Sequence, residues 1–327
     1  MLLALLGALT SGCDAIYEDN CGYDSDYELS YRLRLHYDRN IRFAEAFAAE
    51  VSEVSVYAFD RSGQLVWQGS ESGQALLADG YTMTLPLDPG RYDIIAWCHG
   101  PEGHKAFTIG RGSAQRIEEH CAYLPHTNSE VNHDLRPLFH GMLADVELPD
   151  THGAVYRDIY LTKNTNHIRV MLQRMDGSAI NKDDFDIAIT DANGSLAHDN
   201  SPLPGEAITY TAWNKQNVDA SAIDGTSGDI ITSIDGLVAE MTVSRLVSGT
   251  RPMLSVRTED RDVLRIPLID YLLMVKAEYR RDMSNQDYLD RQDDYSLTFF
   301  LDNDDNWYWM AGIYINSWHV VLQFEDL

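Results

Sequence analysis

The feature that most constrains the fold of this chain is the strict alternation of apolar and polar residues between Tyr27 and Tyr37. Tyr or Leu occupies every second position, and Glu, Ser, Arg or His lies between them. Successive side chains of a strand point to opposite faces, so a period of two is typical of a half-buried β-strand. The sequence therefore predicts a strand here, with one face turned toward a core.

Further strands are predicted in pairs that flank turn residues. Pro89 presets its own backbone angle and Gly90 accepts a positive one, which lets the chain reverse. Strands that recur at short spacing with turns between them favour a sandwich or barrel over alternating βα units. The predicted pairs are residues 51–59 with 64–68 and residues 81–87 with 91–97.

The length of 327 residues suggests two domains. Residues 149–153 (PDTHG) are the best linker candidate, because strand patterns begin again after them. We therefore expect an all-β protein of two tandem β-sandwiches, an N-terminal one over residues 27–150 and a C-terminal one over residues 151–327. Residues 41–50 predict a short helical insert and residues 215–235 an exposed loop, whereas residues 268–279 fit either a helix or a long strand.

The N-terminal segment has the pattern of a bacterial lipoprotein signal. An apolar run leads into Thr10, Ser11 and Gly12 and then Cys13, which would become the lipid-bearing first residue after cleavage. Residues 1–12 are then the signal and the acidic residues 13–26 a tether. A spanning helix needs about 20 apolar residues, and an ordinary secretory signal needs no cysteine at the cut. A buried N-terminal segment is the remaining alternative, and the lack of Lys or Arg before Cys13 is atypical of a signal.

The charge balance limits the partners. The chain has 51 acidic and 25 basic residues and a formal net charge of -26. Such a surface repels polyphosphate, so we expect no nucleic-acid partner. It also repels an anionic membrane, which means that lipid on Cys13 and not a basic patch would hold the protein there.

The remaining cysteines are Cys21, Cys98 and Cys121. Export permits a disulfide, but three thiols leave one over, and the sequence does not assign the pair. Cys98 with Cys121 is the candidate disulfide, and three free thiols are the alternative. Histidines near these cysteines match no paired zinc-ligand spacing, so exposed loop histidines are the preferred interpretation over a metal site. They are His99, His104, His120, His126 and His133.

Motifs for catalysis are absent from the sequence. The acidic turn at residues 302–306 starts like a calcium loop, but Trp307 stands where the loop needs glycine and Ile313 where it needs glutamate. No nucleophile elbow, phosphate-binding glycine loop or H-E-x-x-H helix is present. We therefore expect no enzyme and no cofactor. The aromatic residues within 307–318 could form a platform for a sugar. Both faces of a strand over these residues would be mostly apolar, however, which favours a strand packed on both sides.

Several blocks together resemble the FimB-type fimbrial anchor lipoproteins of Bacteroidetes, a fimbrillin-associated family that includes minor fimbrium anchoring subunits. They occur in family order and span nearly the whole chain. The blocks are residues 13–19 (CDAIYED) with Cys21, 43–47, 54–60 (VSVYAFD), 87–92 (LDPGRY), 161–166 (LTKNTN), 240–246 (EMTVSRL), 286–292 (QDYLDRQ), 299–301 (FFL) and 313–318 (IYINSW).

The resemblance implies two transthyretin-like β-sandwiches and a lipid anchor in the outer membrane, at the base of a fimbria whose length the protein limits by ending the polymer. The implied partners are fimbrial stalk subunits (fimbrillin), bound by β-strand complementation, because an unpaired sheet edge offers amide donors and acceptors to an incoming strand. The alternative is a surface lipoprotein that binds glycan for nutrient uptake.

Overall fold

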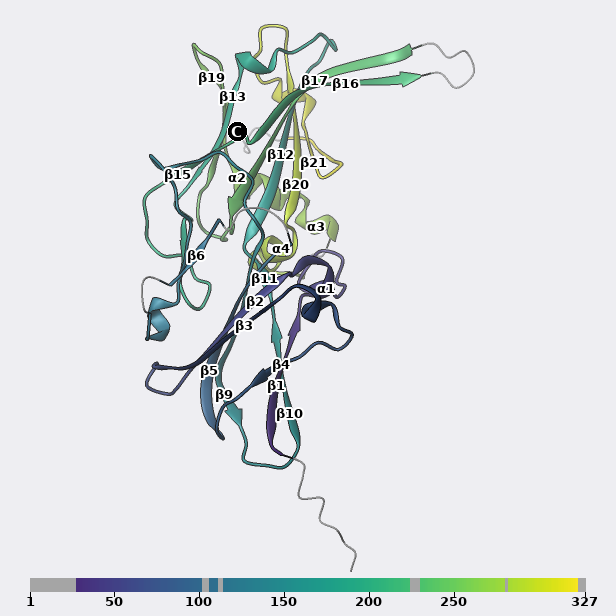
Figure 1. Cartoon of the computed structure of the whole chain (residues 1–327). Helices are drawn as coiled ribbons and strands as arrows, with labels where there is room; N and C mark the ends of the chain where they lie inside the picture. Colours follow the sequence, from purple (N-terminus) through teal and green to yellow (C-terminus); the bar gives the residue numbers. More distant parts are fainter. Residues whose placement is uncertain (1–27, 102–105, 111–113, 224–229, 280–281, 323–327) are drawn as a thin grey trace, which may run out of the picture.

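The computed structural model describes residues 28–101, 106–110, 114–223, 230–279 and 282–322, which are mostly β-strands. Two β-sandwiches lie one after the other along the molecule (Figure 1), so the predicted all-β class with short helical inserts is confirmed. In these ranges no helix is both long and apolar enough to cross a membrane. The helices are α1 (Phe47–Glu50), α2 (Leu268–Leu272), α3 (Lys276–Tyr279), α4 (Asn285–Arg291) and the 3-10 turns Gly73–Leu77, Ile117–Glu119, Lys182–Asp184, Leu273–Val275 and Trp309–Ala311.

The first sandwich packs a sheet of order β10-β1-β4 against a sheet of order β11-β9-β5-β2-β3. On β1 the side chains of Tyr31, Leu33 and Leu35 are buried, and those between them are half-buried or exposed, as the alternation predicted. The strands are β1 (Ser30–His36), β2 (Glu53–Phe59), β3 (Leu65–Ser72), β4 (Met83–Leu85), β5 (Gly90–His99), β9 (Leu138–Leu148), β10 (Ala154–Tyr160) and β11 (Thr162–Lys163).

The boundary between the sandwiches lies later than the break predicted after Asp150. β10 pairs in parallel with β1, and β11 pairs with β9, so residues up to Lys163 complete the first sandwich. The turn that resembled a linker is part of this pairing, because the Gly153 carbonyl accepts a hydrogen bond from the Ser30 N–H at 3.1 Å. The second sandwich therefore begins with β12 (Thr165–Arg174).

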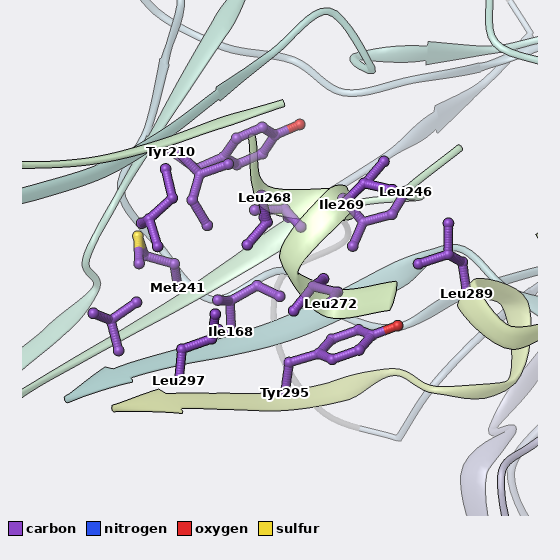
Figure 2. Packing of buried hydrophobic residues seen from close by; sticks show 14 of the residues in the cluster. Ile168, Tyr210, Met241, Leu246, Leu268, Ile269, Leu272, Leu289, Tyr295 and Leu297 are labelled. Carbon is purple, nitrogen blue, oxygen red and sulfur yellow. The ribbon is translucent and has the colours of Figure 1, made fainter. Parts of the chain in front are cut away.

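The second sandwich packs a sheet of order β16-β17-β12-β20-β21-β22, here called the long sheet, against a sheet of order β19-β18-β13-β15-β8. Residues 268–279 are helical, and Figure 2 shows Leu268 and Leu272 of α2 on the side of Ile168 and Tyr295 in the core, with Ile269 beside Leu246. The strands are β13 (Asp186–Asp191), β14 (Ser195–Leu196), β15 (Ile208–Thr211), β16 (Asn214–Ile223), β17 (Ile230–Ser244), β18 (Met253–Arg257), β19 (Asp262–Pro267), β20 (Asp294–Leu301), β21 (Ile313–Ile315) and β22 (Trp318–Val320).

The segment between β5 and β9 links the two sandwiches. The segment contributes β8 (Glu130–Val131), which pairs in parallel with β15 of the second sandwich. It also contributes β6 (Thr108–Ile109) and β7 (Ala122–Tyr123), and β7 pairs with β14. Its apolar residues lie in one core cluster with Trp97 of β5 and with the second sandwich. The two sandwiches therefore share a core.

Two local predictions differ from the structure. Residues 215–235 were expected to be an exposed loop, but β16 and β17 pair from Asn214 opposite Glu240 to Ile223 opposite Ile230 and project from the body as a ribbon (Figure 1). Asp and Gly are uncommon in strands, and their number in this segment is why the composition suggested a loop. The helical insert is shorter than residues 41–50, because only α1 is helical.

Candidate functional site

The predicted lipidation residue Cys13 lies outside the described residues, as does Cys21. The described chain enters the fold through β1, which begins at the end of the first sandwich that is remote from the second sandwich (Figure 1). The opposite end of the molecule carries the β16-β17 ribbon.

Cys98 and Cys121 do not form the candidate disulfide, because both are free and buried in the structure. The cause is strand geometry. Trp97 on β5 points toward the linking segment, and its indole N–H donates to the His120 carbonyl at 3.1 Å, so the next side chain, Cys98, points to the opposite face. Cys98 packs in the first core, and burial raises the pKa of its thiol. The Cys121 thiol donates instead to the Glu118 carbonyl at 3.0 Å.

The histidines near these cysteines have separate environments. His99 and His120 are buried, and the His120 ring packs against Phe59 with 4.8 Å between ring centroids. His126 and His133 are exposed, and His104 lies outside the described residues. Among the residues that the structure describes, no group of three or more His, Cys, Asp or Glu side chains could hold a metal ion.

The aromatic C-terminal stretch has one exposed side, which corrects the prediction of a strand packed on both faces. Ile313 and Ile315 are fully buried, but Tyr314 and Trp318 are 39% and 44% exposed, and Met310 is 60% exposed. These side chains are exposed because β21 and β22 lie at one edge of the long sheet, where only one face of the sheet packs against the core.

A cleft of about 930 Å³ lies where the two sandwiches meet. One wall is the segment that follows β1 and runs through α1, and Figure 1 shows α1 and α4 at this junction. The other wall is the outer face of the long sheet. His167 and Arg169 alternate there with Ile168, which points into the core, so the pleat of β12 brings polar side chains into the cleft.

Lys163 connects the two walls. Its ammonium lies 2.5 Å from the Asp293 carboxylate, just before β20, and 3.1 Å from Glu50 at the end of α1. Burial alone would lower the pKa of Lys163, but Asp293 and then Glu50 outweigh this effect and raise it. The lysine is therefore charged and holds the first sandwich to the second.

A polar network forms the long-sheet wall. The Arg169 guanidinium donates to Glu240 at 2.9 Å, and Asn214 donates to the same carboxylate at 2.7 Å. Burial would raise the pKa of Glu240, but the hydrogen bonds from Asn214 and Arg169 bring it below the usual value. The indole N–H of Trp213 donates to Thr242 at 3.2 Å, which fixes the ring at one side of the cleft.

Several strands have an unpaired side in the part of the chain that the structure describes. Each of β3, β10 and β16 ends a sheet and is seven to ten residues long. Tyr156 and Tyr160 on β10 are 44% and 51% exposed, and Asp158 between them pairs with Arg34 at 2.7 Å. Such edges present backbone groups to which another strand can bind.

Comparison with known proteins agrees with this architecture. Over residues 18–324 the chain matches the model of a family described as fimbrillin-A associated anchor proteins Mfa1 and Mfa2. The chain belongs to this family. The match spans both sandwiches and confirms the resemblance to fimbrial anchors. This Mfa1/Mfa2-type protein is therefore a fimbrium-associated protein of the cell surface, in a family described as anchor proteins.

Individual relatives cover nearly the whole chain. The minor fimbrium anchoring subunit Mfa2 of Porphyromonas gingivalis is 22% identical over 324 residues, which are 97% of this chain and 92% of that protein. The solved structure of the fimbrial anchor protein Mfa2 from the same species has a TM-score of 0.66 at 19% identity, covers 90% of this chain and 99% of its own, and shows the shared fold.

Two crystal structures from Bacteroides thetaiotaomicron are also similar. A candidate adhesin is 30% identical with a TM-score of 0.76, over 90% of this chain and 97% of that one. A candidate polysaccharide-binding protein is 27% identical with a TM-score of 0.77, over 92% of this chain and 100% of that one.

The blocks that carried the family resemblance meet at the junction of this Mfa1/Mfa2-type chain. Arg245 of block 240–246 pairs with Asp290 of block 286–292 at 2.8 Å, and both side chains are nearly buried. Lys163 of block 161–166 binds Asp293, which directly follows the second of these blocks. No pattern in the sequence indicated a site at these residues, and their signal was only that the blocks contain opposite charges.

Proposed function

We propose that this protein is a fimbrial anchor of the outer membrane. Lipid on Cys13 holds its N-terminus in the membrane, and the two-sandwich body binds the base of the fimbrial stalk. Because the bound body is itself fixed, it ends the polymer and limits its length. The observation that carries the proposal is the match to the anchor family over residues 18–324, which includes both sandwiches.

The architecture supports a role that bears load. The sandwiches share a core, and Lys163 of the first sandwich forms an ion pair with Asp293 of the second. A body joined in this way transmits force from one end to the other without a flexible hinge. The chain enters the fold at the end remote from the second sandwich, so a membrane attached there leaves the second sandwich free for the stalk (Figure 1).

The lipid attachment is tested by Cys13→Ala. The net charge of -26 repels an anionic membrane, so the variant should appear in the soluble fraction and take up no radiolabelled palmitate. Cys21→Ala is the matched control and should keep both label and membrane location. Palmitate on the Cys13→Ala protein would refute the assignment of this residue.

The anchoring role is tested by deletion of the gene and electron microscopy of the cell surface. Cells without the protein should shed their fimbriae or carry longer ones, and the wild-type gene should restore retention and length. Fimbriae of unchanged length that stay attached to the deletion strain would contradict the proposal.

The stalk contact is proposed to be β-strand complementation at one of the free edges. Backbone amides that gain a partner exchange their hydrogens more slowly. Hydrogen–deuterium exchange of the protein with and without purified stalk subunits should therefore show new protection confined to one of β3, β10 or β16. A complex that forms without protection of any edge strand would argue against strand complementation.

A further inference from the structure

The cleft at the junction contains polar groups that have no partner within the described part of the chain. The side-chain oxygen of Gln292 and the side-chain nitrogen of Asn316 are buried and unpaired, and both residues line the cleft. Gln292 is only 7% exposed. Buried polar groups are rarely left unpaired, because each loses its water without gaining a protein partner.

The two groups need opposite partners. The Gln292 oxygen accepts a hydrogen bond and the Asn316 nitrogen donates one. A hydroxyl group does both, since it carries one donor hydrogen and two acceptor lone pairs. A ligand with several hydroxyl groups therefore offers each side chain the kind of partner that it lacks.

The other surfaces of the cleft suit a ring that is polar at its rim and apolar on its face. Trp213 presents an indole that its bond to Thr242 holds in place. His167, Arg169 and Asp294 supply planar polar groups along the sheet. His167 pairs with Asp294 at 3.3 Å and Arg169 with Glu240 at 2.9 Å, and these pairs keep the groups fixed before a ligand binds. Ligand sites commonly combine such an aromatic surface with a few oriented polar groups, and they often lie between domains.

Charge narrows the ligand class. Glu45, Glu50, Asp134, Asp293 and Asp294 line the cleft, against Arg42, Lys163 and Arg169. Lys163 is already paired with two carboxylates and Arg169 with Glu240. Together with the net charge of -26, this balance disfavours an anionic ligand.

We infer that the cleft between the sandwiches binds an uncharged oligosaccharide, with a sugar ring stacked on Trp213 and hydroxyl groups bound by Gln292 and Asn316. The volume of about 930 Å³ has room for a segment of glycan and is open to solvent, so a chain can extend beyond the cleft. This site is separate from the lipid and from the strand edges. The protein therefore contacts a surface glycan independently of its contact with the stalk.

Isothermal titration calorimetry tests the inference on the whole purified protein. The probes are four uncharged hexasaccharides, namely maltohexaose, cellohexaose, mannohexaose and chitohexaose, with hexagalacturonate as the charged counterpart. At least one uncharged probe should bind, and hexagalacturonate should not. Binding by none of the four uncharged probes, or by hexagalacturonate alone, overturns the inference.

Two variants locate the binding. Trp213→Ala removes the stacking surface, and Asn316→Asp exchanges the unpaired donor for an acceptor of nearly the same shape, so each should weaken binding about tenfold or more. Tyr156→Ala, which removes an exposed aromatic residue from β10, is the control and should bind like the wild type. Thermal unfolding without sugar checks that each variant is folded. If Trp213→Ala does not fold, the affinity of Asn316→Asp alone tests the inference. Unchanged affinity in a folded Asn316→Asp or Trp213→Ala protein overturns the inference.

Discussion

Lys163 joins the two sandwiches through two carboxylates, and its side chain is only 16% exposed. Lys163→Met keeps the length of the side chain but leaves Glu50 and Asp293 close together without a cation. We expect the free energy of unfolding to fall by about 2 kcal/mol, since hydrogen bonds to charged groups contribute more than neutral ones and both carboxylates are partly screened by water. Urea unfolding followed by tryptophan fluorescence measures the change.

Lys182→Met is the matched control for Lys163→Met. Lys182 also pairs with a carboxylate, Asp183, at 2.8 Å, but the two side chains are 39% and 70% exposed. An exposed ion pair contributes little, so the loss should stay below about 0.5 kcal/mol. Equal losses of stability in the two variants would show that the ion pairs of Lys163 at the junction contribute no more than an exposed ion pair.

His140 makes stability sensitive to acid. Burial lowers its pKa from 6.5 to about 4, and the ring packs 4.5 Å from Trp97 while its Nε2 donates to the His198 carbonyl. Above pH 6.5 the histidine is neutral in the folded and the unfolded state. Between pH 6.5 and about 4 only the unfolded state takes up the proton, so stability is lost as the pH falls, by about 3 kcal/mol in total.

His140→Gln removes this titration. The variant should be less stable than the wild type at neutral pH, because it loses ring packing against Trp97. Its stability should fall less on acidification, so the gap between the two proteins should narrow from about pH 7 to about pH 4. Urea midpoints measured across this range decide the matter, and a gap that stays constant would show that His140 does not titrate as inferred.

At the scale of elements, Gly141 lets β9 lie close to the segment that completes the first sandwich. A Cβ at this position would lie 2.8 Å from Cγ1 of Ile159 and 3.0 Å from Cδ2 of Leu161, and both of these side chains are fully buried. Gly141→Ala should therefore overpack the core and lower the free energy of unfolding by about 1–3 kcal/mol.

Gly205→Ala is the control for Gly141→Ala. The nearest atom to a Cβ at Gly205 is the Leu203 carbonyl oxygen at 3.9 Å, so the change should stay within about 0.5 kcal/mol. Thermal and urea unfolding of both variants give the comparison. A Gly141→Ala protein as stable as the wild type would mean that β10 and β11 can move away from β9 at little cost.

Local patterns in the sequence predicted the elements whose signal is contained within a few consecutive residues. β1 and the β2-β3 hairpin follow from alternation and turn residues, because both properties act over a few residues. The parallel pairs of β1 with β10 and of β8 with β15 did not follow, since their partners lie far apart in the sequence. Two-residue strands such as β8 are also too short to show a period.

The sequence did not predict the cleft, because its lining residues also lie far apart along the chain. His167, Trp213 and Gln292 are ordinary residues in their own segments, and only the order of the long sheet brings their strands together. Family blocks were the one signal that reached across the chain, and they marked the ion pair between Arg245 and Asp290 without showing that the two residues meet.

At the scale of the whole molecule, the linking segment turns two sandwiches into one body. Val131 and Leu135 come from the first half of the chain but are buried in the core of the second sandwich. Neither sandwich can lose this segment without exposing apolar surface, which costs free energy in proportion to its area. We therefore expect the two sandwiches to unfold together although they have separate sheets.

Differential scanning calorimetry of the purified protein tests this coupling. Leu135→Ala truncates the shared core and Leu33→Ala truncates the core of the first sandwich, and each should cost about 2–5 kcal/mol. If the sandwiches are coupled, the wild type shows one transition and each substitution lowers that whole transition. Two resolved transitions, of which Leu33→Ala lowers one and Leu135→Ala the other, would show instead that the sandwiches unfold independently and that force on the stalk could open one without the other.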